Sequence, residues 1–307
     1  MSTASPAAAL VPSRLELKAL PTTTAAVEVS GPRPSVAVEP VVEALRDRGF
    51  LALTGAGMST DSGIPDYRGP GSVSRSPMTY QEFLSGGVAQ QRYWARGFVG
   101  WSRMGRAEPN AGHTALARLE AHGVCTAVIT QNVDGLHEQA GSSRLVALHG
   151  RIADVVCLAC GDRTSRASLQ ERMVEANPGW LARHAQAPVR PDGDVETDDT
   201  GDFRVPRCLR CSGTLKPDVV YFGENVPKPR VQRCYDLVDQ AAEQGAALLV
   251  LGSSLAVMSG LRFVRHATKR AVPVVIVNRG ATRGDPLATA TLHHGTSEFL
   301  TSPLWYD

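Results

Sequence analysis

The chain has 307 residues, of which 43% are hydrophobic, so it is long enough to bury one large core or two unequal ones. Its net charge of +2 at pH 7 is too small to favour nucleic acid or an anionic membrane as the main partner. With 6% aromatic residues it lacks the basic and aromatic surface that binds single strands, and no apolar run approaches the roughly 18 residues of a membrane span. We therefore expect neither direct nucleic-acid contact nor a membrane span.

Residues 1–38 differ in composition from the rest of the chain. They are rich in Ala, Ser, Thr and Pro, show no periodicity, and lack the basic region and apolar stretch of a secretory signal. We expect a disordered tail, and the absence of acidic residues over Met1 to Arg14 leaves a transit peptide as the alternative. Scarce lysines beside many arginines indicate a GC-rich bacterial genome. The expected location is the cytoplasm of a bacterium, with a mitochondrial location left open for a eukaryotic source.

Short apolar strands alternate with helical patterns from residue 41 onward. Strands are expected at 50–54, 124–130, 145–148, 219–222, 247–251 and 274–277. Helices are expected at 41–48, 114–122, 231–244 and 261–270. Buried strands alternating with helices predict an α/β fold with a mostly parallel sheet covered on both faces.

Two stretches interrupt this alternation. Residues 70–110 carry Trp94, Phe98 and Trp101 at helical spacing, and we interpret this stripe as core packing in a helical insert rather than as a ligand site. Residues 154–213 carry paired cysteines near both ends and an acidic run between them, which is typical of a solvated loop.

Four cysteines form two C-x-x-C pairs in the second stretch, namely Cys157, Cys160, Cys208 and Cys211. Each pair places two thiolates on one tight turn, and two pairs complete the tetrahedral coordination of a zinc ion. Because no coordination position then remains for water or substrate, the pattern predicts a structural rather than a catalytic zinc. Redox activity is the alternative for one C-x-x-C pair, but two pairs in one aperiodic segment favour metal binding.

Gly55 and Gly57 follow the first strand, where a dinucleotide-binding turn belongs. Glycines at such a turn let backbone N–H groups approach a pyrophosphate at the N-terminus of the following helix. Thr60 replaces the third glycine of G-x-G-x-x-G, so this turn alone fits a plain strand-to-helix connection equally well. The adjoining loop, Gly63 to Gly69, adds an Asp, a Tyr and an Arg that a simple connection does not need.

Polar residues also follow the other expected strands. They occupy Thr130 to His137, His149-Gly150, Gly252 to Leu255, and Asn278. Because ligands of open α/β sheets bind at the carboxyl ends of the strands, we expect these residues to form one active-site rim. Each of these residues taken alone could be a strand-end cap or a buried structural histidine. That explanation does not account for polar residues at the ends of five strands.

These residues resemble the motifs of the sirtuin family. The matching segments are GAGMSTDSGIPDYRG, TQNVDGLH, LHG, the two C-x-x-C pairs, KPDVVYFGE and GSSL, and the resemblance runs from about Phe50 to the C-terminus. It implies a doubly wound, Rossmann-like NAD-binding domain over 39–153 and 214–307. It also implies a small inserted domain that combines a zinc-binding module at 154–213 with the helical insert at about 70–110. The site would lie in the cleft between them.

Within the family, the segments GIPDYRG, QRYWARGFVGW, LQER and PDGDV resemble the class II branch, which includes the mitochondrial lipoamidase and ADP-ribosyltransferase type and its bacterial relatives. That branch is associated with weak deacetylation, removal of unusual acyl groups such as lipoyl, and ADP-ribosyl transfer. The Tyr-x-x-Arg pair of desuccinylating sirtuins is missing after the cofactor loop. Tyr93 and Arg96 have its spacing but lie in the aromatic helix, so we do not expect acidic acyl groups.

The resemblance also implies roles for individual residues. His149 matches the general base that draws a proton from a ribose hydroxyl, and Asn132 and Asp134 match residues that organise the catalytic site. The positions that match NAD-contacting segments are Gly55, Ala56, Gly57, Ser59, Thr60, Ile64, Pro65, Asp66, Tyr67, Arg68, Gln131, Asn132, Val133, Asp134, Gly252, Ser253, Ser254, Asn278, Arg279, Gly280 and Thr296. The acylated peptide is expected as an added strand against Val220, Phe222, Gly223, Glu224, Leu255 and Val257.

The expected function is that of an NAD-dependent protein-lysine deacylase, acting on acetyl or longer groups such as lipoyl. NAD would be a co-substrate, and the products would be nicotinamide, an O-acyl-ADP-ribose and free lysine. A protein mono-ADP-ribosyltransferase using the same NAD site is the alternative. A noncatalytic NAD- or zinc-dependent binding module is a further one, which the catalytic residues disfavour. The expected partners are one structural zinc ion and an acyl-lysine protein or peptide, and the oligomeric state is left open, a monomer included.

Overall fold

The computed structural model describes residues 37–66, 77–184 and 200–306. The predicted tail before residue 37 and most of the predicted acidic run lie outside these residues, as do Tyr67 and Arg68. The limits predicted for the inserted domain stay a prediction.

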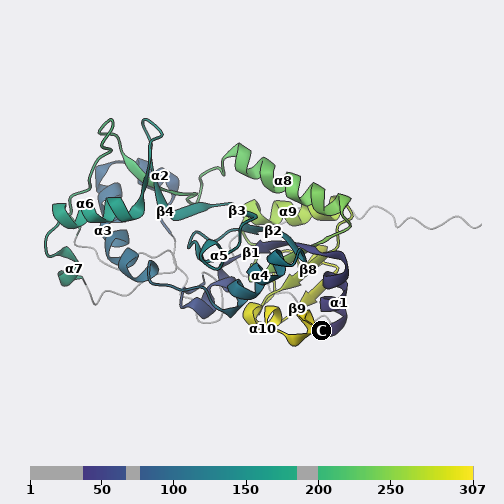
Figure 1. Ribbon diagram of the computed structural model, residues 1–307. Helices are drawn as coiled ribbons and strands as arrows, with labels where there is room; N and C mark the ends of the chain where they lie inside the picture. Colours follow the sequence, from purple (N-terminus) through teal and green to yellow (C-terminus); the bar gives the residue numbers. More distant parts are fainter. Residues whose placement is uncertain (1–36, 67–76, 185–199, 307) are drawn as a thin grey trace, which may run out of the picture. The chain divides into compact units, whose positions relative to one another are not determined.

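A six-stranded sheet lies at the centre of the described residues, and every neighbouring pair of its strands runs parallel (Figure 1). Its order is β3-β2-β1-β7-β8-β9. The strands are β1 (Phe50–Thr54), β2 (Cys125–Thr130), β3 (Leu145–Ala147), β7 (Ala247–Leu251), β8 (Val274–Val277) and β9 (Ala290–Leu292). The chain adds β2 and β3 on one side of β1 and the later strands on the other. The order therefore reverses between β1 and β7, which is where open α/β sheets bind ligands.

Helices cover both faces of this sheet. Phe50 and Ala52 of β1 belong to one buried cluster, whereas Leu51 and Leu53 belong to a second, as expected when side chains alternate between faces. The first cluster packs against α1 (Val38–Arg48), α4 (Ala111–Ala121) and α10 (Thr296–Leu300), and the second against α8 (Lys228–Glu243) and α9 (Met258–Lys269). The doubly wound α/β architecture predicted from the sequence is confirmed.

The helix starts differ consistently from the prediction. Helices α1, α4, α8 and α9 each begin three residues before the predicted start. Apolar periodicity marks only the buried face, whereas the first turn depends on caps. Asn110 caps α4 by accepting from the His113 backbone N–H at 3.1 Å, and Pro229 lies in the first turn of α8.

A second, antiparallel sheet has the order β5-β4-β6, and its bounds are β4 (Gly150–Cys157), β5 (Arg163–Ser165) and β6 (Leu215–Val219). Its core includes residues of helices α3 (Gly87–Met104), α6 (Arg166–Ala176) and α7 (Trp180–Arg183). Helix α2 (Tyr80–Leu84) contacts α3 through Phe83 and Tyr93. Trp94 and Phe98 of α3 are fully buried beside Val155 of β4, which confirms that this part of the aromatic stripe is core. Trp101 is half-buried instead, with the Arg166 guanidinium 5.0 Å from its ring centre.

The strand predicted at 219–222 is wrong. The chain forms β6 earlier, at Leu215–Val219, and pairs it antiparallel with β4 rather than with the parallel sheet. The sequence did not predict this strand because it contains Lys216 and Pro217. A buried lysine and a proline both argue against an interior strand. Strand β9 was not predicted.

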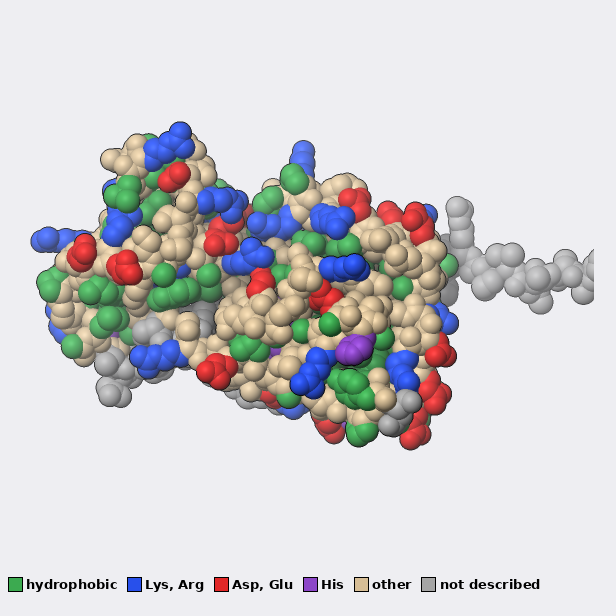
Figure 2. Space-filling view, viewed as in Figure 1, with side chains coloured by type: hydrophobic (Ala, Val, Ile, Leu, Met, Phe, Trp, Pro, Cys, Tyr) green, Lys and Arg blue, Asp and Glu red, His purple; other side chains and the backbone are tan. Residues whose placement is uncertain are grey.

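Two 3₁₀ turns, Ala56–Met58 and Thr60–Ser62, follow β1 in place of the α-helix expected there. Gly63 ends them in the left-handed region at φ 80°, which glycine adopts without strain. The remaining short elements are α5 (Leu136–Gln139) and 3₁₀ turns at Asp285–Leu287 and Pro303–Trp305. Within the described ranges, every helix is too short or too polar to cross a membrane. On the face shown in Figure 2, acidic and basic side chains are interspersed, as the small net charge suggests.

Candidate active site

A cavity of about 780 Å³ lies where the sheet order reverses. The segments that follow β1, β2, β3, β7 and β8 all line it, which is the rim expected from polar strand ends. Its other wall is the end of β6 and the segment after it, residues 219–226. Residues next to the parallel sheet and residues next to the antiparallel sheet therefore line the same cavity.

Glycines allow the loops after β1 and β7 to touch at this point. The Gly57 N–H donates to the Gly252 carbonyl at 2.8 Å. A Cβ on Gly57 would lie 2.9 Å from the Gly252 Cα, and Gly252 itself has φ 61°. A side chain at either position would force the two backbones apart. The Thr296 hydroxyl also donates to the Gly57 carbonyl at 3.2 Å, which fixes the loop from a third element.

A half-buried polar network holds the predicted catalytic amide and carboxylate. The Asn132 side-chain amide donates to the Gly55 carbonyl and to the Ser59 hydroxyl, both at 3.0 Å. Ser59 in turn donates to an Asp134 carboxylate oxygen at 2.7 Å. Burial raises the pKa of Asp134, while hydrogen bonds from the Leu136 N–H and from Ser59 oppose the shift. Ser59 does not line the cavity, but it positions two residues that do.

His149 lies at the carboxyl end of β3 with both ring nitrogens engaged. Its Nδ1 is 2.8 Å from the backbone carbonyl of Gln131, and its Nε2 is 2.7 Å from the Ser259 hydroxyl. Burial lowers the pKa of His149, the Gln131 carbonyl opposes that shift, and the charge of Arg230 adds to it. The ring is therefore neutral at neutral pH, which is the state that a general base requires.

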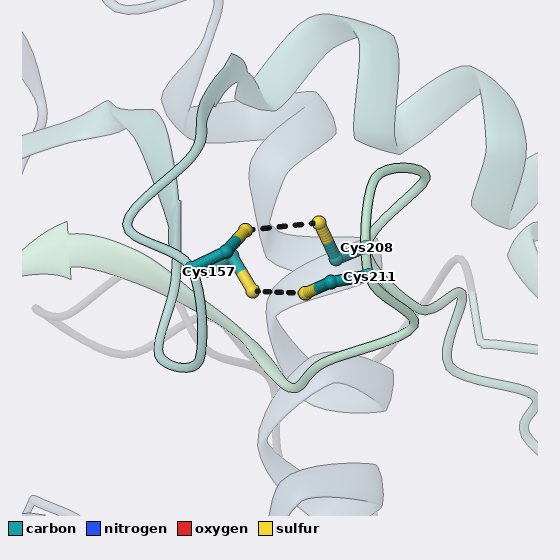
Figure 3. A group of neighbouring side chains, drawn as sticks. Cys157, Cys208 and Cys211 are labelled. Atoms are coloured by element: carbon teal, nitrogen blue, oxygen red, sulfur yellow. Dashed lines mark hydrogen bonds between the residues drawn. The ribbon is translucent and has the colours of Figure 1, made fainter.

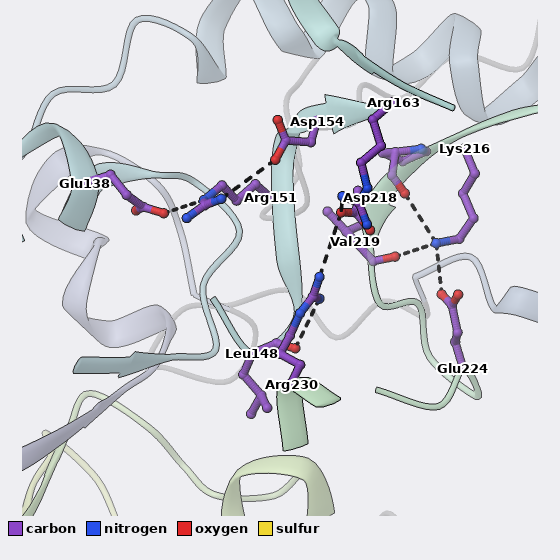
Figure 4. Close-up of polar contacts among 11 residues, drawn as sticks. Glu138, Leu148, Arg151, Asp154, Arg163, Lys216, Asp218, Val219, Glu224 and Arg230 are labelled. Atoms are coloured by element: carbon purple, nitrogen blue, oxygen red, sulfur yellow. Dashed lines mark hydrogen bonds and ion pairs between the residues drawn. The ribbon is translucent and has the colours of Figure 1, made fainter. Parts of the chain in front are cut away.

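The wall opposite the sheet is held by a buried ion pair (Figure 4). Lys216, 3% exposed, places its ammonium 3.0 Å from a Glu224 carboxylate oxygen and 4.5 Å from the Tyr221 ring centre. The same carboxylate oxygen accepts the Tyr221 N–H at 2.9 Å. Burial lowers the pKa of Lys216 and the Glu224 charge opposes this, so the pair keeps the lysine charged. Together these contacts fix the segment between β6 and α8.

The wall is also joined directly to the predicted base. The Val220 N–H donates to the His149 carbonyl at 2.8 Å. Gly150, the first residue of β4, has φ 82°, and a Cβ there would lie 1.8 Å from the Asp218 carbonyl oxygen. Only glycine permits this pairing of β4 with β6 beside His149.

The described residues of the predicted site converge on this cavity, apart from Ser59. Those that line it are Gly55, Ala56, Gly57, Thr60, Ile64, Pro65, Asp66, Gln131, Asn132, Val133, Asp134, His149, Val220, Phe222, Gly223, Glu224, Gly252, Ser253, Ser254, Leu255, Val257, Asn278, Arg279, Gly280 and Thr296. Sequence reasoning missed Ser259, Met258, Tyr93, Tyr221 and Ile152, which line it too. Two of them have a signal in the sequence: Ser259 is a polar residue soon after the GSSL motif, and Tyr93 begins the Tyr-x-x-Arg pattern in the aromatic helix.

The four predicted metal ligands form a separate cluster. Their sulfur atoms all lie within 4.8 Å of one another (Figure 3). The Sγ–Sγ separations are 3.5 Å for Cys157 and Cys211 and 3.8 Å for Cys160 and Cys208. A tetrahedral zinc with Zn–S bonds of about 2.3 Å requires sulfurs about 3.8 Å apart, so the donor set fits one zinc ion with no position left open. None of these cysteines lines the cavity, which fits a structural role.

The backbone around the cluster also suits a thiolate. N–H groups of Cys160 and Ala159 point at the Cys157 sulfur and lower the pKa of its thiol to about 6. Gly213 lies so close that a Cβ there would be 2.8 Å from the same sulfur. The two remaining cysteines, Cys125 and Cys234, are fully buried in the sheet clusters, as expected of small hydrophobes.

We compared the chain with known protein families and with curated proteins. The Sir2 family profile matches residues 55–259. A Mycobacterium avium (strain 104) protein named "NAD-dependent protein deacetylase 1" is 54% identical over 263 residues, covering 85% of this chain and 92% of the relative. A Streptomyces coelicolor protein of the same name is 57% identical over 253 residues, covering 81% and 83%.

Solved structures agree with the sequence comparison. A structure described as "Sir2-p53 peptide-NAD+" superposes with a TM-score of 0.68 at 30% identity, covering 86% of this chain and 96% of that one. Another, described as "Sir2 bound to acetylated peptide", gives a TM-score of 0.67 at 28% identity, with the same coverage. The motifs, the fold and these matches together show that the chain belongs to the Sir2 family of sirtuins.

Proposed function

We propose that the chain is an NAD-dependent protein-lysine deacylase whose first substrate is acetyl-lysine. The names of the bacterial relatives support deacetylation, and one structural neighbour is described as bound to an acetylated peptide. Removal of longer groups such as lipoyl, and membership of the class II branch, rest on the sequence motifs alone and are proposed with it.

The observation that carries this proposal is the composition of the cavity. One side offers glycine backbone, Asn132 and Asp134 for a nucleotide and its ribose. The neutral imidazole of His149 lies between the two sides, ready to take a proton. The other side is the wall after β6, where a peptide would add as a strand.

Apolar side chains at the cavity mouth suit an acylated lysine. Phe222 and Met258, each 40% exposed, line the cavity from the wall after β6 and from the first turn of α9. Tyr93, Tyr221 and Ile152 line the same cavity. Such a lining suits a methylene stem and an uncharged acyl group better than an acidic one.

The test is incubation of the purified protein with NAD and a panel of acyl-lysine peptides, from acetyl to lipoyl, with nicotinamide and O-acyl-ADP-ribose both measured. We expect both products in equal amounts, with the preferred peptide identifying the acyl group. A labelled protein acceptor in place of O-acyl-ADP-ribose would favour the ADP-ribosyltransferase. No nicotinamide with any peptide would contradict both enzymes and favour a binding module.

His149→Ala tests the assignment of the base. We expect turnover to fall by about 10²- to 10⁴-fold, the range for loss of a general base, with NAD affinity largely kept. His122→Gln is the matched control, because His122 is exposed at the far end of α4. Near wild-type turnover in His149→Ala would refute the assignment.

A further inference from the structure

The Ser259 hydroxyl is within hydrogen-bond distance of the Nε2 atom of His149, and both residues line the cavity. Ser259 is the second residue of α9 and is 8% exposed. Its Oγ lies 2.7 Å from His149 Nε2, although 110 residues separate the two in sequence. The contact is therefore made by tertiary packing.

The direction of this hydrogen bond follows from the other ring nitrogen. His149 Nδ1 faces the Gln131 carbonyl at 2.8 Å, and a carbonyl oxygen can only accept. Nδ1 must therefore carry the ring proton. In a neutral imidazole Nε2 then holds a lone pair, so Ser259 donates its O–H to Nε2. Nucleophile–base pairs of hydrolases show the same order of hydroxyl, imidazole and orienting acceptor.

Packing keeps the first turn of α9 close to His149. Gly260 follows Ser259, and a Cβ at Gly260 would lie 2.4 Å from the Gln131 side-chain oxygen. Leu261 and Phe263 anchor the same helix in the buried cluster beneath the sheet. A substrate hydroxyl that approaches Nε2 therefore meets Ser259 first, and a serine that donates its proton still has lone pairs to accept another.

We propose that Ser259 relays the proton between the substrate and His149, an inference that rests on the deacylase function. The ribose hydroxyl gives its proton to Ser259 Oγ while Ser259 gives its own proton to His149 Nε2. Ser259 ends unchanged and the imidazole ends protonated. This step follows the one in which the amide oxygen bonds to the ribose carbon that has lost nicotinamide, which leaves a C=N bond to the lysine nitrogen. The freed ribose oxygen then forms a bond to the acyl carbon, and one electron pair of that C=N bond moves onto the lysine nitrogen.

The relay acts only after NAD has lost its nicotinamide, and this separates it from a merely structural role. Cleavage of the glycosidic bond needs no base, so loss of the Ser259 hydroxyl should leave that step intact. Formation of O-acyl-ADP-ribose should fall. A misplaced His149 loop or a damaged cavity would instead impair NAD binding and both steps together.

The experiment compares Ser259→Ala, Ser259→Thr and the wild type on the best acyl-peptide. Exchange of labelled nicotinamide into NAD reports the first step, and O-acyl-ADP-ribose formation reports the second. For Ser259→Ala we expect kcat for product to fall about tenfold or more, within the range for loss of a positioned proton-transfer group, with exchange and KM for NAD nearly unchanged. Ser259→Thr keeps the hydroxyl and should restore most of the product. Ser168→Ala is the control, because Ser168 lies in the first turn of α6 and outside the cavity.

Three other outcomes would contradict the relay. Wild-type product formation by Ser259→Ala would overturn the relay and leave the deacylase function standing. Equal loss of exchange and product, without rescue by Ser259→Thr, would show a structural role and also overturn the relay. A wild type that releases no nicotinamide with any acyl-peptide would overturn the proposed function and the relay together. Thermal melting with and without NAD confirms that each variant is folded.

Discussion

Two buried histidines beside the carboxyl end of β1 should make the protein sensitive to mild acid. His113 and His137 are at most 1% exposed, and their ring centres are 4.7 Å apart. Thr54 donates its hydroxyl to Thr130 and so accepts from His137 Nε2 at 2.9 Å. His113 Nδ1 accepts the Asn110 N–H at 3.3 Å. Both rings are thus neutral, with His113 Nε2 and His137 Nδ1 lacking a hydrogen-bond partner among the described residues.

Burial lowers the pKa of His113 from 6.5 to about 4, against the charge of Asp61. Burial, together with the neighbouring His113, lowers the pKa of His137 to about 3. The unfolded chain therefore binds more protons than the folded one below pH 6.5. Stability is complete above that pH and is lost as the pH falls toward the folded-state values. At pH 5 each histidine should cost about 2 kcal/mol, so the pair costs about 4 kcal/mol of a typical 5–15 kcal/mol.

Urea unfolding at pH 8, 6 and 5 measures this loss. Because other groups also titrate, the informative quantity is the difference between the wild type and His113→Gln at each pH. Whatever that difference is at pH 8, it should move by about 2 kcal/mol in favour of the variant by pH 5. His122→Gln, on the exposed end of the same helix, is the control for an added glutamine. A difference that stays constant from pH 8 to pH 5 would refute the assignment of neutral buried rings.

Two further predictions concern the small sheet. Removing zinc with a strong chelator should unfold this sheet, because zinc binding at such sites contributes about 10 kcal/mol or more to folding. Trp94 and Trp180 lie in the same core, so their fluorescence should shift to the red. Unchanged fluorescence and circular dichroism after verified zinc loss would contradict a structural site. Gly150→Ala should abolish deacylation and lower the melting temperature, because its Cβ would overlap the Asp218 carbonyl. Wild-type melting and turnover in this variant would show that β4 and β6 can separate there at no cost.

The parallel sheet was predictable because each of its main strands can be recognised from its own short stretch of sequence. The runs at 50–54, 247–251 and 274–277 are short, apolar and followed by glycine or asparagine, and the structure has strands with the same bounds. A strand buried on both faces needs nothing but such a run. The same logic failed for β6, because Lys216 is tolerated there only through Glu224 and the neighbouring carbonyls.

The residues of the candidate site also fall into two groups: those that the strand order brings together, and those that depend on how helices pack. His149, Asn132 and Asp134 lie two to four residues after the end of a strand, so the topology alone brings them to one edge. Ser259 and Tyr93 do not follow a strand of the parallel sheet. Ser259 meets His149 from the first turn of α9, where Gly260 packs against the Gln131 side chain, and Tyr93 reaches the cavity from α3. Such contacts depend on how helices pack and leave no periodic trace in the sequence.

The four-cysteine cluster and His149, the proposed base, are linked through one stretch of chain, although no cysteine lines the cavity. Strand β4 begins at Gly150, directly after His149, and ends at Cys157. Its partner β6 leads into Val220, whose N–H holds the His149 carbonyl. Loss of the zinc should therefore release the far end of both strands and weaken the contact that fixes the base. A structural zinc outside the cavity can in this way control turnover, and product formation should fall in step with zinc content while His149 itself is intact.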